Sequence, residues 1–223
     1  MAQSVLEEHG RDARATEPES SLSFERVVFF SDAVFAIVIT LLVLEIKTPH
    51  LTDHNEAALK HALFELIPKF SGFVVSFLIV GMMWIEHHRI FRYINHYDAG
   101  LLWRNLLLLL CVSFVPFPTA LFSEFFWSRT AFIFYTASFA CVALAKLWVW
   151  RYAGSKPSLL APNVDELTVK RITRRSMAVP IACVVVMALS LISIWIAPVG
   201  FATIPLIARL LDPTRTKLKA AES

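Results

Sequence analysis

The chain has 223 residues, of which 57% are hydrophobic, and its formal net charge at pH 7 is only +3. Charged residues make up 17% of the chain, against about 25% in ordinary soluble domains, and the apolar residues are grouped into runs near the length of about 20 that crosses a bilayer. This composition excludes an ordinary soluble domain, and the small net charge gives no signal for nucleic-acid binding. We therefore predict an all-α membrane protein.

The N-terminal segment, residues 1–23, is polar, with five acidic residues and no apolar run. We expect no signal peptide there but a disordered cytoplasmic tail. Residues 24–211 are expected to form the transmembrane domain, and residues 212–223 a cytoplasmic C-terminal tail.

Five apolar runs follow in chain order, at 27–46, 66–85, 101–122, 131–150 and 177–196. The polar residues 50–62 predict a short loop or surface helix, and the basic residues 151–176 predict a loop. Pro198 and Gly200 indicate a turn after the fifth run. The last apolar piece, 199–211, contains Pro205 and fits a sixth span, a half-helix or a surface helix.

The distribution of basic residues favours six spans with both termini in the cytoplasm. With that topology, sixteen of the 21 Lys and Arg residues lie in or beside cytoplasmic segments, as the positive-inside rule requires. Five spans would export the basic C-terminal residues. Lys146 lies inside the fourth run, where we expect its long side chain to reach the inner headgroups.

The first apolar run carries polar residues that a membrane span usually lacks. Asp32 lies inside it, and an ionised carboxylate at that depth needs polar partners or water. At 100° per residue, Ile37, Thr40, Leu41 and Leu44 share one stripe, while Ser31 and Asp32 point elsewhere.

Polar residues on two other spans fall at the depth of Ser31 and Asp32. These are Trp84 and His87 near the end of the second run and Asn105 near the start of the third. A hydrogen-bond network joining three spans is therefore expected. Two roles stay open for it: holding the helices together, or acting directly in transport.

No cofactor or metal site is expected. Glu86-His87-His88 lacks the spacing of a helical zinc motif, because adjacent histidines point about 100° apart. The three cysteines lie inside apolar runs with no ligand spacing. We therefore expect no enzyme.

These motifs together resemble the transmembrane protein 175 potassium channels, and more closely their bacterial single-repeat members. The first-helix motif is Arg26-x-x-x-Phe30-Ser31-Asp32, followed by an Ala-Ile-x-x-Thr stretch and Leu44-Glu45-Ile46. Trp84-x-x-His87-x-x-x-Phe91, Asn105 and Phe114-x-Pro116-Phe117 agree with it, so the resemblance covers about residues 24–211.

The resemblance implies a six-helix subunit that assembles as a homotetramer in the bacterial inner membrane, with the first helix lining a central potassium pore. Membrane lipids and permeating potassium ions are the other implied partners. Apolar rings replace a carbonyl filter, and by motif position they are Ile37, Leu41 and Leu44, with Thr40 as a hydroxyl layer. Arg26, Phe30, Ser31, Asp32, Trp84, His87 and Asn105 would support the pore helix.

Two alternatives remain at this stage. A proton- or cation-coupled secondary transporter would use Asp32 as its key residue and would need a broken helix or an internal repeat. Glu45, at the outer end of the first helix, would either attract cations to the pore mouth or pair with Lys47 or another basic residue of the loop.

Overall fold

A computed structural model describes residues 24–51 and 55–211 of the chain. The tails expected at 1–23 and 212–223 lie outside the described residues. Within the described part, regular structure is helical apart from one isolated bridge between Ile94 and Leu160.

Five of the described helical segments are long and apolar enough to cross a membrane. They are Phe24–Glu45, Ile67–Phe91, Ala99–Glu124, Arg129–Gly154 and Glu166–Ile192. A further apolar segment, Ala197–Leu211, has fewer than 18 residues. The prediction of an all-helical, multi-pass membrane protein is confirmed, while the sixth crossing stays a prediction.

The first helix ends in a 3-10 turn, η1 (Leu42–Glu45), and α2 (Glu56–Glu65) follows as the surface helix that the polar stretch allowed. The second span is α3 (Ile67–Phe91), which extends past the expected end at residue 85. The third span divides into α4 (Ala99–Phe114) and α5 (Pro116–Glu124), since Pro116 and Pro118 lack the amide N–H groups that a continuous helix needs. The fourth span is α6 (Arg129–Gly154).

The loop expected over 151–176 is wrong for its second half, which forms α7 (Glu166–Ser176). The Asp165 side chain caps this helix by accepting a 2.8 Å hydrogen bond from the Thr168 amide. Glu166 and Lys170 form an ion pair of 2.6 Å one turn apart. The charges that suggested a loop therefore stabilise an amphipathic helix, which continues into α8 (Ala178–Ile192).

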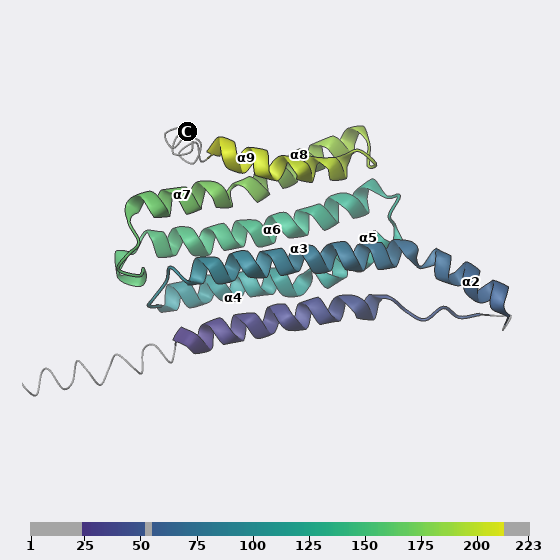
Figure 1. Ribbon diagram of the computed structural model, residues 1–223, viewed down its shortest axis with the longest axis horizontal. Coiled ribbons are helices and arrows are strands. Elements are labelled where there is room, and N and C mark those ends of the chain that lie inside the picture. Colours follow the sequence, from purple (N-terminus) through teal and green to yellow (C-terminus); the bar gives the residue numbers. More distant parts are fainter. Residues whose placement is uncertain (1–23, 52–54, 212–223) are drawn as a thin grey trace, which may run out of the picture.

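The helices form one bundle with α6 in its middle (Figure 1). The first helix lies along one edge, and α8 lies along the opposite edge with η3 (Ala197–Thr203) and α9 (Ile204–Leu211). The α6 helix is the most buried span because it contacts α4, α5 and α8. Figure 1 also shows α2 projecting beyond the bundle.

One end of the bundle holds the start of the first helix, the ends of α3 and α6, and the start of α7. Arginines at the ends of α3 and α6 and along α7 lie there, and we call it the basic end. The opposite end, at η1 and α5, is the distal end.

A charged cluster joins α4 to α6 at the basic end. The Asp98 carboxylate accepts hydrogen bonds from Lys156 Nζ at 2.7 Å, from the Tyr152 hydroxyl at 2.8 Å and from the Leu101 amide at 2.8 Å. A side chain at Gly100 would collide with the Tyr152 hydroxyl, so glycine permits this close approach. The hydrogen bond from Lys156, followed by those from the Leu101 amide and Tyr152, lowers the pKa of Asp98 from its usual 3.8 to about 2.

We predict that Asp98→Asn lowers the thermal unfolding midpoint by a few degrees at neutral pH. Asn is as good a helix N-cap as Asp, so the decrease in stability would come from the lost charge and not from a lost cap. Because the folded-state pKa lies below the usual value, the ionised carboxylate stabilises the fold fully above about pH 4 and progressively less toward pH 2. The difference between Asp98→Asn and the unaltered protein should therefore shrink over that range; a difference independent of pH would contradict it.

Candidate functional site

The first helix packs against the rest of the subunit through one narrow face. Ser31, Phe35, Val38 and Leu42 are buried on it, and their spacing places them within about 60° of one another around the helix. The 3-10 turn at the end of this face contacts α3 and α5. The first helix thus meets the rest of the bundle through this one face.

A polar network crosses this face at the level of Ser31. Asn105 on α4 donates from Nδ2 to the Ser31 hydroxyl at 2.9 Å, and its Oδ1 accepts from His87 Nε2 on α3 at 3.2 Å. Ser31 in turn donates to the Val27 carbonyl at 2.9 Å. The three side chains are buried, so one amide links three membrane spans.

Apolar rings hold the histidine of this network in place. The His87 ring stacks on Phe91 with centroids 4.2 Å apart and lies 5.4 Å from the Phe35 ring. Because the Asn105 oxygen can only accept, Nε2 carries the proton of this hydrogen bond. Nδ1 has no hydrogen-bond partner within the described part of the chain.

Asp32 lies beside the network but has a separate partner. It is half-buried and accepts a hydrogen bond of 2.8 Å from Trp84 Nε1 on α3. The structure thus brings Ser31, Asp32, Trp84, His87 and Asn105 together at the joint between three spans. Arg26 and Phe30, which the motif included, are exposed and lie outside this cluster.

The residues of the apolar stripe lie on the opposite side of the first helix. The exposed fractions are 57% for Ile37, 41% for Leu41 and 67% for Leu44. Thr40 is also exposed, and its hydroxyl donates to the Ile37 carbonyl of its own helix at 2.8 Å. The stripe therefore makes no contribution to the core of the single subunit and is available to a pore or to lipid.

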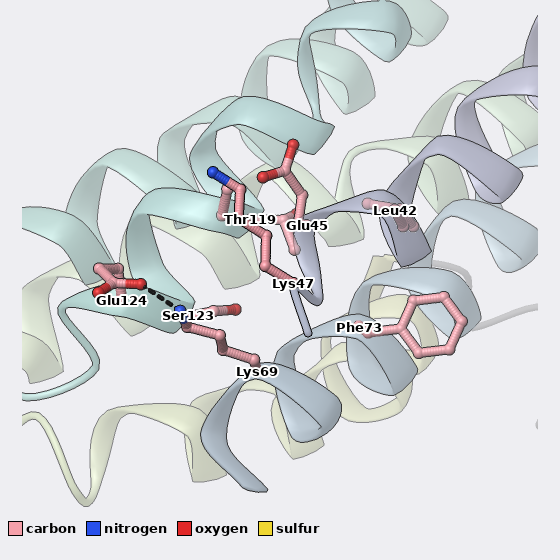
Figure 2. A pocket seen from close by; sticks show the side chains of 9 residues that line it. Leu42, Glu45, Lys47, Lys69, Phe73, Thr119, Ser123 and Glu124 are labelled. Atoms are coloured by element: carbon pink, nitrogen blue, oxygen red, sulfur yellow. Dashed lines mark ion pairs between the residues drawn. The ribbon is translucent and has the colours of Figure 1, made fainter. Parts of the chain in front are cut away.

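A small polar pocket of about 100 Å³ lies at the distal end of the first helix. Figure 2 shows the ion pair of Lys69 and Glu124 at one side of this pocket, and Glu45 and Lys47 lie at the other side without a drawn contact. Lys69 Nζ and the Glu124 carboxylate are 2.6 Å apart. Within the described residues no ion pair joins Glu45 to Lys47, so the simple pairing considered for Glu45 is not formed.

The histidines and acidic groups form no metal centre within residues 24–51 and 55–211, where no three such side chains gather at ligand spacing. Glu86 is paired with Arg89 at 2.6 Å instead. His87 is held by Asn105, as described above.

Phe35, Val38 and Leu42 belong to the site but were not singled out from the sequence. The sequence does contain a pattern that indicates them, because together with Ser31 they repeat at the spacing of one helix face. A second buried set, Ser76, Thr119 and Tyr135, joins α3, α5 and α6 by hydrogen bonds of 2.9 and 3.1 Å. Its members are too far apart in sequence for any local pattern to connect them.

We predict that Asn105→Leu destabilises the protein by about 1–3 kcal/mol, since it removes two interhelical hydrogen bonds of roughly 0.6–1.7 kcal/mol each. Reversible unfolding in detergent would measure the loss. Thr40→Val is the matched control, because the Thr40 hydroxyl bonds only within its own helix. Equal stability of the two variants would show that the network does not hold the spans together.

Comparison with known proteins agrees with this geometry. The model of the family described as "Endosomal/lysosomal potassium channel TMEM175" matches residues 26–116. A protein of Chamaesiphon minutus named as a potassium channel is 39% identical over 175 residues, covering 77% of this chain and 86% of that relative. The chicken protein named "Endosomal/lysosomal proton channel TMEM175" is 36% identical over 110 residues, 47% of this chain and 22% of its own length.

The structural comparison gives the same family. The crystal structure of a lysosomal potassium-selective channel TMEM175 homolog from Chamaesiphon minutus superposes with a TM-score of 0.72 at 36% identity, covering 85% of this chain and 98% of that one. These relatives are ion channels and not enzymes. The identity and coverage show that this chain is a member of the TMEM175 family of membrane channels.

Proposed function

We propose that this protein is a potassium-selective channel whose pore is lined by the first helix of four identical subunits. The observation that carries the proposal is the division of that helix into two faces. Phe35, Val38 and Leu42 are buried against the subunit, while Ile37 and Leu41 on the other side are exposed. The names of the bacterial relatives support potassium as the permeating ion.

A pore on the exposed face requires several copies of the chain. The first helix lies at the edge of the bundle (Figure 1), and no described helix of the same subunit lies beyond it to close a channel. Symmetric copies around an axis would enclose the exposed stripe. We assign four copies, the number that the family resemblance implies, with Ala197–Leu211 as the sixth membrane segment of each.

The constriction in this proposal consists of rings of Ile37, Leu41 and Leu44, with the Thr40 hydroxyls between them. A narrow apolar ring excludes water and blocks ions, whereas a slightly wider ring conducts. Ser31, Asp32, Trp84, His87 and Asn105 support the pore by fixing the helix rotation, and Arg26 and Phe30 lie at its inner end. Glu45, which is not paired with Lys47, would raise the cation concentration at the outer mouth.

The basic end faces the cytoplasm in this proposal, because the positive-inside rule places Lys and Arg there. Both termini are then cytoplasmic, and the bacterial origin of these relatives supports the inner membrane as its location. A secondary transporter would need a broken helix, and the third span does divide between α4 and α5. The first helix, which carries Asp32, nevertheless runs from Phe24 to Glu45 as one segment. The channel is therefore the better-supported function.

We predict that Ile37→Ala and Leu41→Ala each change potassium flux several-fold and reduce potassium preference over sodium, because each widens an apolar ring. The measurement is the flux of potassium and of sodium into liposomes that contain the purified protein. Val43→Ala is the control: Val43 is also an exposed apolar residue of the first helix, but it points about 120° away from Ile37.

Unaltered flux in both stripe variants would contradict the apolar constriction. Proton flux measured in the same liposomes tests the ion itself, since the chicken relative is named as a proton channel. If protons pass but potassium does not, the permeating ion is the proton and the proposal of a potassium channel is wrong.

A further inference from the structure

A large apolar cavity of about 580 Å³ is lined mainly by residues of α3, α6, α8 and α9. Its volume is in the range of about 300–1,000 Å³ that small-molecule sites occupy. It extends from the middle of the bundle, near Val75 and Phe139, to the basic end at Glu86 and Arg175. Its walls are apolar along most of that length, and its charged groups gather at the basic end.

Lys146 is the unexpected member of this lining. Its position in α6 suggested a side chain that reaches the membrane surface, but only 7% of it is exposed. Within the described part of the chain its ammonium group forms no hydrogen bond or ion pair. A buried cation without a close counter-charge is unfavourable, so this group lacks a partner.

The surrounding charges do not supply that partner. Glu86 is the acidic residue of the lining, and it is already paired with Arg89 at 2.6 Å and lies 3.9 Å from Arg175. Lys146 is attracted to Glu86 and repelled by both arginines. Three cations therefore share one carboxylate, and this end of the cavity is complementary to one further negative charge.

We propose that the cavity binds one acyl chain of an anionic phospholipid, with the phosphate at Lys146 and Arg175. A lipid combines a long apolar part with a negative group at one end, which matches the distribution of apolar and basic groups along this cavity. Basic pockets between membrane helices near a headgroup layer are the known setting for such recognition. An apolar face of a second subunit would fill the volume but would leave Lys146 without a counter-charge.

The bound acyl chain would contact side chains that orient the first helix. Phe35 and His87 both line the cavity, and the two rings lie 5.4 Å apart. His87 is also the network partner of Asn105. Lipid occupancy would thus stabilise the joint between spans, whichever ion the channel conducts.

Native mass spectrometry of the purified full-length protein, titrated with phosphatidylglycerol or phosphatidylcholine, tests the site. We expect phosphatidylglycerol to bind preferentially, and Lys146→Met to weaken it about tenfold, the loss of one charge-assisted hydrogen bond. Val179→Trp should also weaken binding, since Val179 lines the cavity and the indole ring of Trp would occupy part of it. Lys146→Met retains a long apolar side chain, so the fold should be preserved.

Two control variants keep the test specific. Lys170→Met removes an exposed basic residue of α7 that is paired with Glu166, and Val184→Trp enlarges an exposed residue of α8 outside the cavity. Both should bind phosphatidylglycerol like the unaltered protein. Equal binding of the two lipids, or unaltered binding in both Lys146→Met and Val179→Trp, would overturn the proposal. A changed subunit number in Val179→Trp with unaltered lipid binding would show that another copy occupies the cavity.

Discussion

The side-chain amide of Asn105 is the interaction on which the arrangement of this subunit depends. In an apolar interior, a helix that packs through Phe35, Val38 and Leu42 alone could rotate at modest cost, because lipid satisfies apolar side chains as well as protein does. The hydrogen bonds from Asn105 to Ser31 and from His87 to Asn105 are directional, and they select one rotation. Ser31 lies about 120° from Ile37 around the helix, so fixing Ser31 inward turns the apolar stripe outward.

The two ends of the bundle use charge in different ways. At the basic end, Asp98 ties α4 to α6 through Lys156 and Tyr152, and α7 forms because its charged residues pair along a helix face. At the distal end, Lys69 pairs with Glu124 across α3 and α5, which leaves Glu45 free of such a pair among the described residues. Polar contacts thus fasten the helices at both ends. Within the described residues, the interior is joined by the network at Asn105, by the neighbouring Asp32–Trp84 hydrogen bond and by the set around Tyr135.

Sequence reasoning succeeded where the physics is local. Helix periodicity placed Ile37 and Leu41 on one face and Ser31 on another, and common depth in the membrane brought Trp84, His87 and Asn105 toward the first helix. It failed for two different reasons. The loop prediction over α7 gives too much weight to charges that interrupt the apolar pattern, although the Asp165 cap and the Glu166–Lys170 pair of this helix are local. Lys146 is buried instead of reaching the membrane surface because residues of other helices surround it. The Asp98–Lys156 pair and the cavity join residues from separate helices, so no local pattern could reveal them.

The account depends most on the direction in which the first helix faces. Cysteine cross-linking at two neighbouring positions, in a background without the native Cys111, Cys141 and Cys183, tests that direction directly. Leu41 is on the exposed stripe and Leu42 is fully buried within the subunit. Oxidation should link copies of the chain through Leu41→Cys, whose side chains would surround a shared axis, and should not link copies through Leu42→Cys. Cross-links through Leu42→Cys, or none through Leu41→Cys, would contradict a pore lined by this stripe.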